Sequence, residues 1–373
     1  MNVARPPRLN LHHARLKQEQ SFDKPQDKGG IYSGSLSPNL QPPTPPALLS
    51  TQEPFAACAV GNYILFEQSD GTTLYRCVDA KTDDEYVCKS INNNRERFSR
   101  GQHRKVDVYM VVPNEKYQKT VAGHFRLDVH PNINQIEQVL IGETRSYIIF
   151  SRSYGDLHSY VRNKRRLREQ EALRLFRQVV QAVQACHEAG VILRDLKLRK
   201  FVFKDPERTQ LKLETLDDAV VLNEGSNDHL SDKHGCPAYV SPEILTTSGS
   251  YSGRAADCWS LGVILYTLLV GRYPFHDTDH NALFGKICRG KFSIPDTMSS
   301  RAKCLIRSLL RKDPTERLAI DDVLQHPWFS LVSREGASCL DSQLHTHNGD
   351  DSKALDQTVP DLAVPEGSIS SFI

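Results

Sequence analysis

The chain has 373 residues, of which 39% are apolar, so it is long enough for one large domain or two of ordinary size. Its 47 basic and 45 acidic residues leave a formal net charge of +2, too small to favour nucleic acid or a membrane as a partner. Nine cysteines stand without a CxxC pair, which suits a reducing compartment better than a disulfide framework or a zinc site. The N-terminus lacks the apolar run of a signal peptide, and the longest apolar run, residues 261–270, is about half of what a bilayer span needs, so we expect a soluble protein of the nucleus and cytoplasm.

The N-terminal region is polar and rich in proline. Residues 1–60 contain many Pro, Ser, Gln and charged side chains, as in the stretch SLSPNLQPPTPPALLS. Such a composition does not bury enough apolar surface to offset the entropy lost on ordering, so we expect this segment to be disordered.

Short β-branched and aromatic runs begin at Tyr63 and are separated by turn residues. This pattern is typical of a meander of antiparallel strands. The predicted strands lie at residues 63–68, 72–79, 85–92, 136–143 and 146–153.

An atypical insertion at residues 92–115 interrupts this pattern, because a strand should lead quickly into a helix there. One interpretation of this segment is a long surface loop, because loop length costs little stability. The other reading is a non-coding segment retained in the gene, and the sequence leaves both readings open.

The periodicity becomes helical after Gly155. Apolar residues recur on one face of residues 167–190, which predicts an amphipathic helix ended by Gly190. Residues 257–271 are apolar almost all round, which predicts a helix buried at a domain centre. Strands first and helices afterwards indicate an α+β protein with a β-rich lobe joined to an α-helical lobe.

Motifs over residues 61–329 stand in the order found in protein kinases. Lys89 in VCK resembles the lysine that grips nucleotide phosphates, and RDLK at residues 194–197 resembles the catalytic loop. Arg317 in DPTERL resembles the arginine that pairs with the activation-segment glutamate, here Glu243. The resemblance implies a bilobal protein-kinase-like fold, with further matches in HPNI at 130–133, GCPAYVSPE at 235–243 and DCWSLG, beginning with Asp257.

The departures from the kinase pattern fall on the groups that hold phosphate and metal. Glu67, Ser69 and Thr72 stand where the phosphate-covering loop needs glycines. Thr215 stands where an aspartate should hold magnesium, and Lys200 replaces the second metal ligand, an asparagine. An ammonium near a divalent ion is repelled by roughly several kcal/mol, so we expect neither a metal nor catalysis.

Each of these departures could be compensated individually, so that metal or nucleotide binding is retained. Asp217 could shift into the metal position, and Lys200 could point into solvent. No glutamate of the helix that should follow the lysine strand stands out as a partner for Lys89, and Glu115 is a poor candidate because it borders the insertion. Lys89 could keep a weak, metal-independent contact with ATP.

This set of losses, with SDKHGCPAYVSPEIL and LRDLKLRKF intact, closely resembles the Tribbles family of pseudokinases. The resemblance implies that Arg194, Asp195 and Lys197 are vestigial, with the arginine anchoring the activation segment and the aspartate bonding nearby backbone. We further hypothesise that Lys200 neutralises carboxylates that no longer hold a metal. The triplet at residues 215–217 reads TLD where relatives commonly show SLE.

The C-terminal tail, residues 330–373, carries seven acidic and two basic side chains and no periodic pattern. It includes the peptide DQTVPD, in which proline limits the entropy lost on binding, valine fills an apolar pocket and the acids meet basic groups. The resemblance implies that it binds a RING ubiquitin ligase of the constitutive photomorphogenesis class, whose WD40 propeller reads Val-Pro peptides. The ligase-binding residues are then Asp356, Gln357, Val359, Pro360 and Asp361.

The resemblance implies further partners. CCAAT/enhancer-binding transcription factors would be held by the pseudokinase domain, and some family members bind the kinase Akt. MAP kinase kinases would bind around His326, Pro327, Trp328 and Phe329, although such aromatic residues often pack on the lobe instead.

Three functions are therefore compared. The first is an adaptor that brings substrates to the ligase and restrains protein kinase signalling. The second is a weak atypical kinase that uses ATP without metal, and the third is a docking protein that occupies MAP kinase kinases without ubiquitination.

Overall fold

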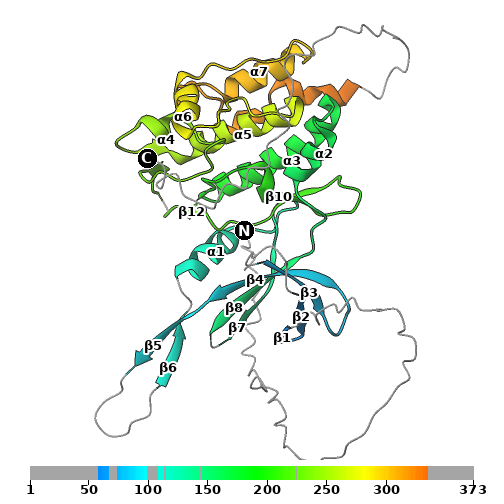
Figure 1. Ribbon diagram of the computed structural model, residues 1–373, viewed down its shortest axis with the longest axis vertical. Coiled ribbons are helices and arrows are strands. Elements are labelled where there is room, and N and C mark those ends of the chain that lie inside the picture. The colour runs from blue at the N-terminus through cyan, green and yellow to red at the C-terminus, as the bar shows by residue number, and fades with distance from the viewer. Residues whose placement is uncertain are drawn as a thin grey trace, which may run out of the picture.

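The computed structural model describes residues 58–66, 74–98, 108–112, 115–142, 144–223 and 225–334. These residues form two lobes, a sheet-containing N-terminal lobe and a helical C-terminal lobe, with one helix of the first lobe lying near the junction (Figure 1). The protein-kinase-like α+β architecture predicted from the motifs is confirmed.

The N-terminal lobe is built on a six-stranded antiparallel sheet with the order β1-β2-β3-β4-β8-β7. All five predicted strands are present, although most are shorter than expected. The sheet strands are β1 Cys58–Val60, β2 Tyr63–Phe66, β3 Leu74–Asp79, β4 Glu85–Asn92, β7 Ile136–Ile141 and β8 Arg145–Ser151, and the helix of the lobe is α1 Glu115–Arg126.

Two small apolar clusters hold this lobe together, one on each face of the sheet. Cys88 and Ile149 belong to one face, while their neighbours Ile148 and Phe150 belong to the other, as the alternation of a strand requires. The second cluster includes Val121 of α1, so the helix packs against that face.

Two predictions from the sequence were wrong, one on the start of the domain and one on the structure of the insertion. Residues 58–60, assigned to the disordered segment, form β1 and pair with β2 in the register Cys58↔Leu65. The insertion at residues 92–115 is not a plain loop, because β5 Asn94–Phe98 and β6 Val108–Val112 form an antiparallel hairpin that projects from the lobe (Figure 1). The valine-rich run VYMVV has the composition of a strand, which explains this outcome.

The C-terminal lobe is mainly helical, with short strands at the junction and in the activation segment. Its helices are α2 Leu157–Lys164, α3 Glu169–Glu188, α4 Pro242–Thr246, α5 Gly253–Val270, α6 His280–Arg289, α7 Ser300–Leu309, α8 Ile320–Val323 and the 3₁₀ segments η1 Leu198–Lys200 and η2 Pro327–Arg334. Its strands are β9 Val191–Ile192, β10 Phe201–Phe203, β11 Leu211–Leu213, β12 Val220–Val221, β13 His229–Leu230 and β14 Tyr251–Ser252.

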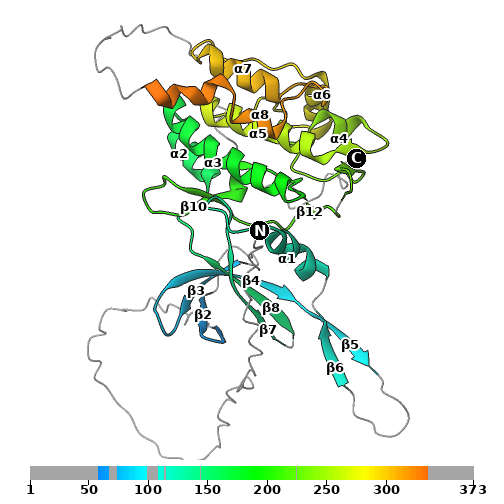
Figure 2. The same cartoon turned by 180° about the vertical axis from the view of Figure 1, so that it is seen from behind.

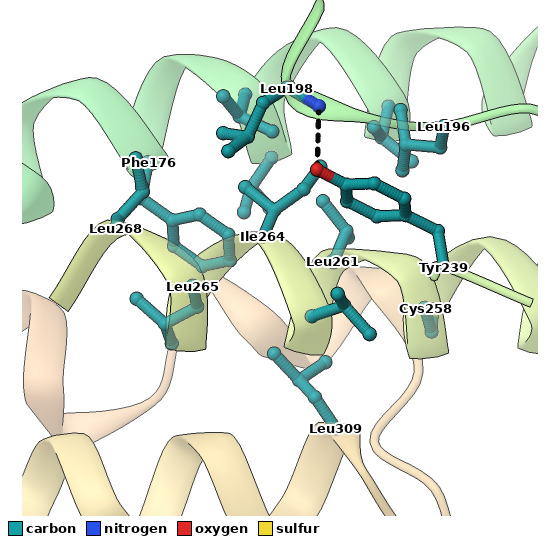
Figure 3. Packing of buried hydrophobic residues seen from close by; sticks show 14 of the residues in the cluster. Phe176, Leu196, Leu198, Tyr239, Cys258, Leu261, Ile264, Leu265, Leu268 and Leu309 are labelled. Atoms are coloured by element: carbon teal, nitrogen blue, oxygen red, sulfur yellow. Dashed lines mark hydrogen bonds between the residues drawn. The ribbon is translucent and has the colours of Figure 1, made fainter. Parts of the chain in front are cut away.

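Helix α5 lies at the centre of this lobe, as its all-round apolar sequence predicts. Leu261, Ile264 and Leu265 pack between α3 on one side and α7 on the other (Figure 3). The backbone N–H of Leu198 donates to the buried Tyr239 hydroxyl at 3.5 Å, which joins the catalytic loop to this core (Figure 3). By length and mean hydropathy, 1.2, α5 could cross a membrane, but 83% of it is buried inside the lobe, as in a core helix.

The long helix α3 ends close to the predicted position. Its last helical residue is Glu188, and Gly190 follows with a φ of +73°, a left-handed conformation that favours glycine. The chain then turns directly into β9 and the catalytic loop.

Candidate functional site

The catalytic loop is anchored by a buried carboxylate. Asp257 of α5 accepts hydrogen bonds from the backbone N–H groups of Leu193 and Arg194, each at 2.9 Å, and its Oδ2 lies 2.8 Å from His187 Nε2. Arg194 itself has a φ of +65°, a strained conformation for a residue with a side chain. The buried carboxylate therefore fixes the start of the loop against the central helix.

The Arg194 side chain reaches the activation segment, where its guanidinium forms an ion pair with Asp232. The carboxylate of Asp195, which we expected to hydrogen-bond nearby backbone, instead lies 2.5 Å from Lys197 Nζ. These two contacts tie the catalytic loop to the activation segment and join two of its own side chains.

A second ion pair clamps the end of the activation segment. Arg317, whose side chain is fully buried, binds both carboxylate oxygens of Glu243 at 2.6 and 2.9 Å. Its Nη1 also donates to the Ala255 carbonyl oxygen at 2.6 Å. The structure thus brings together the two residues that the sequence motif pairs.

Lys200, at the position where a kinase has its second metal ligand, lies in an ion pair. Its Nζ is 2.7 Å from Asp218 Oδ2, and His234 Nε2 is 3.4 Å from the other oxygen of that carboxylate. Burial alone would lower the pKa of Lys200, but the carboxylates of Asp218 and Asp195 raise it above its ordinary value. The hydrogen bond from His234 and the Lys200 ammonium hold the pKa of Asp218 well below its usual range.

Lys89, at the position of the kinase lysine that binds the nucleotide phosphates, is also in an ion pair. It is 5% exposed on β4, and its ammonium forms an ion pair with Asp217. A phosphate would compete with this carboxylate for the Lys89 ammonium. Asp217 Oδ2 is held by Lys89, whereas Asp217 Oδ1 is buried without a hydrogen-bond partner among the described residues, so the rescue by a register shift would have to use a carboxylate whose charge an ammonium already balances.

The helix α1 contributes no described carboxylate to Lys89, and the Glu115 side chain lies outside the described residues. Instead, a Cβ added at Gly123 would lie 3.0 Å from Leu216 Cβ, so α1 packs closely on the triplet at residues 215–217. Beside this contact, burial lowers the pKa of His124 to about 4. The imidazole is consequently neutral next to the Lys89–Asp217 pair at pH 7.

The residues present do not fit a magnesium ion. Thr215 is buried and offers a neutral hydroxyl, and the neighbouring carboxylates of Asp217 and Asp218 are each paired with a lysine. Mg²⁺ prefers anionic oxygens in a near-octahedral arrangement, and fixed ammonium groups repel it. The hollow that Lys200, Thr215 and Asp218 line measures about 10 Å³, close to the space of one water.

The segment HPWF is mostly part of the core. Trp328 is completely buried, and its Nε1 donates to Glu169 Oε1 at 2.8 Å. Phe329 is 4% exposed, its ring stacks on Phe176 and the Arg177 guanidinium lies 4.9 Å from the ring centre. The alternative that these two rings pack on the lobe is therefore confirmed, and the binding of MAP kinase kinases by this segment stays a prediction.

Pro327 is exposed and His326 is half-buried, so this segment keeps a small surface. The predicted ligase-binding residues, together with Glu67, Ser69 and Thr72 of the phosphate-covering loop, lie outside the described residues. Sequence reasoning missed Asp218, for which the adjacent Asp217 was the available signal, and Asp232, which stands between a serine and a lysine and carries no such signal.

Comparisons with known proteins identify the family. The protein kinase domain family matches residues 69–329. Mouse Tribbles homolog 2 is 50% identical over 96% of this chain and 98% of its own length, human Tribbles homolog 1 is 55% identical over 70% and 67%, and mouse Tribbles homolog 3 is 46% identical over 87% and 83%. The chain therefore belongs to the Tribbles family, as a regulatory protein built on the protein kinase fold.

Proposed function

We propose that this protein is a pseudokinase adaptor that recruits a RING ubiquitin ligase to substrates held by its kinase-like domain. The observation that carries the proposal is the pairing of Lys200 with Asp218 and of Lys89 with Asp217. Together these pairs consume the charges that phosphoryl transfer would need for metal and phosphate. A cleft closed in this way favours a role in binding over a role in catalysis.

The tail supplies the recruiting element of the proposal. The peptide at residues 356–361 joins an apolar Val-Pro pair to acidic residues, a combination suited to a WD40 propeller with basic groups around an apolar pocket. About 22 residues separate it from the last described residue, Arg334. A flexible chain of this length spans roughly 25 to 30 Å, so ligase and substrate would share a high effective concentration.

A pulldown with the ligase's WD40 propeller tests this proposal directly. In Val359→Ala/Pro360→Ala, we expect capture of the full-length chain to be lost, because the apolar anchor is removed. The chain offers a matched control, since Val364 and Pro365 repeat the dipeptide five residues later. Val364→Ala/Pro365→Ala should leave capture intact, and equal capture of both variants and the natural chain would refute the assigned peptide.

The substrates in this proposal are CCAAT/enhancer-binding transcription factors, held by the kinase-like domain in the nucleus. The protein also binds and modulates MAP kinase kinases and Akt in the cytoplasm, and needs neither nucleic acid nor a membrane. Because Trp328 and Phe329 are buried, the MAP kinase kinase contact proposed here uses the surface around His326 and Pro327. If the protein acted only by occupying MAP kinase kinases, deletion of residues 350–373 would leave its inhibitory effect unchanged.

A second candidate is a weak atypical kinase with metal-independent ATP binding. The specific observations in its favour are the retained Asp195–Lys197 contact at 2.5 Å and the burial of Lys89. A thermal-shift assay with ATP discriminates the two, because the adaptor predicts no additional shift when Mg²⁺ is added. A large magnesium-dependent shift would favour the kinase.

A further inference from the structure

A groove with a basic rim lies at the end of the C-terminal lobe, far from the catalytic loop. Its floor is made by the apolar side chains of Leu167, Leu269 and Met298, and its volume is about 410 Å³. The rim carries Lys164, the last residue of α2, together with Arg166 and Arg168 from the connection between α2 and α3. Glu169 and Thr297 complete the lining, and we call these eight residues the basic groove. It adjoins η2, the orange segment of Figures 1 and 2, because Glu169 of the lining accepts a hydrogen bond from Trp328 Nε1 of η2.

Positive charge predominates in the basic groove, whose lining holds three cationic side chains and one carboxylate, that of Glu169. Arg166 and Arg168 are exposed and have no ion pair with any residue in the described part of the chain. Lys164 pairs with Glu171 at 2.7 Å, yet 45% of its side chain remains exposed. Glu169, the acidic residue at the groove, already accepts hydrogen bonds from Ser299 and from Trp328 Nε1.

The loop that carries the rim is held in one backbone conformation. Arg165 has a φ of +66°, a left-handed conformation that costs energy for a residue with a side chain. Its carbonyl oxygen lies so close to Gly271 that a Cβ there would be 1.8 Å away, and Leu167 N donates to Leu268 O at 2.8 Å. The guanidinium groups are therefore presented from a fixed frame, which lowers the entropy lost on binding.

We propose that the basic groove binds an acidic peptide segment of a partner protein that carries one aliphatic side chain. Arginine forms bidentate hydrogen bonds with carboxylates, so Arg166 and Arg168 suit acidic residues flanking the anchor. The apolar floor suits the aliphatic anchor itself, and pockets of this size commonly bury such groups. The floor is concave and aliphatic, which favours an inserted side chain over a flat lipid surface or stacked bases.

This docking surface goes beyond the proposed recruitment of a ligase and is independent of it. It uses neither the tail peptide nor the Lys200 and Lys89 pairs. Its failure would leave the adaptor proposal standing, and failure of the propeller pulldown would leave the groove untouched.

Fluorescence anisotropy of the full-length chain with a fluorescein-labelled EEDLEE peptide tests the proposal. We expect saturable binding that weakens with added salt, because the rim charges are exposed and screened. Arg166→Glu/Arg168→Glu should weaken binding at least about tenfold. The matched control Lys81→Glu/Lys204→Glu reverses two exposed lysines away from the groove and should change the affinity less than about twofold.

Two further measurements identify what the groove reads. Met298→Gln, and a peptide with serine in place of leucine, should each weaken binding at least about threefold, since both remove the apolar contact. An equal loss in the Lys81→Glu/Lys204→Glu control, or no loss in the arginine variant, would overturn the proposal. So would arginine-dependent binding to phosphatidylserine vesicles without binding to the peptide.

The chain's own acidic tail is the remaining occupant to be tested. In the full-length chain with Asp350→Asn, Asp351→Asn and Asp356→Asn, an unchanged affinity for the peptide supports a partner segment. A gain of about tenfold or more would mean that the tail competes for the basic groove, and would overturn the assignment to a partner. A thermal melt of each variant confirms that it is folded.

Discussion

Removing the charge of Lys200 tests whether this ammonium stabilises the Asp218 carboxylate in place of a metal ion. Lys200→Met keeps most of the side-chain volume but leaves the Asp218 carboxylate without its cation. Breaking a fully buried ion pair costs about 3 to 5 kcal/mol. The two side chains are 16% and 32% exposed, so solvent screening reduces the expected loss in the free energy of unfolding to about 2 kcal/mol.

Chemical denaturation of a double-mutant cycle measures this interaction. The cycle combines Lys200→Met with Asp218→Asn, and we expect a coupling energy of about 1 to 2 kcal/mol. A matched control is Lys197→Met, which removes a neighbouring lysine and should show no coupling with Asp218→Asn. A coupling energy below about 0.5 kcal/mol would refute the idea that Lys200 neutralises this carboxylate in place of a metal.

The same cycle has a defined pH dependence. The pKa of Asp218 is depressed in the folded protein, so its contribution to stability is complete above the ordinary aspartate pKa and is lost as pH falls through the folded value. The destabilisation caused by Lys200→Met should therefore be full at neutral pH and shrink in acid. A loss that grew as the pH was lowered would contradict the assignment.

Three further predictions concern the frame around the site. Trp328→Ala should lower the free energy of unfolding by about 3 to 5 kcal/mol in a denaturant titration, because the ring is completely buried, and a loss under about 1 kcal/mol would show it to be surface-like. The pKa of His124 is about 4 in the folded protein, so in acid the imidazole takes up a proton more readily after unfolding than before it. Between pH 7 and pH 4 the free energy of unfolding should therefore fall by about 2 to 3 kcal/mol more in the natural chain than in His124→Gln, and parallel pH profiles of the two proteins would contradict this. Glu243→Ala should cost about 3 to 5 kcal/mol, because the Arg317 guanidinium is left buried and unpaired, whereas an unchanged melting temperature would contradict that ion pair.

The fold could be predicted because its signals are local and repeated. The strands and the central apolar helix each show a recognisable hydrophobic pattern in the sequence. The kinase motifs occur in the order typical of the fold, and this order assigns each pattern to its place in the two lobes. The hairpin at β5 and β6 was missed because its first strand, NRERF, is polar and lacks the alternation that marks a half-buried strand.

The site could be predicted in part. The sequence alone identified the residues that replace the metal and phosphate ligands, but it did not identify the side chains with which those residues now pair. Asp217 and Asp218 are adjacent and chemically identical, and the backbone direction alone decides that one meets Lys89 and the other Lys200. The basic groove was missed for a similar reason, since a run of arginines after α2 has the composition of an ordinary solvated loop.

The central claim, that a divalent cation has no seat in this cleft, is tested most directly with Mn²⁺ as a spin probe. Electron paramagnetic resonance of Mn²⁺ and ATP, titrated with the full-length chain, reports how much of the metal becomes immobilised by the protein. The paired carboxylates predict a signal no different from that of Mn²⁺–ATP alone. Stoichiometric immobilisation of Mn²⁺ that requires ATP and is lost in Asp217→Asn would contradict the account.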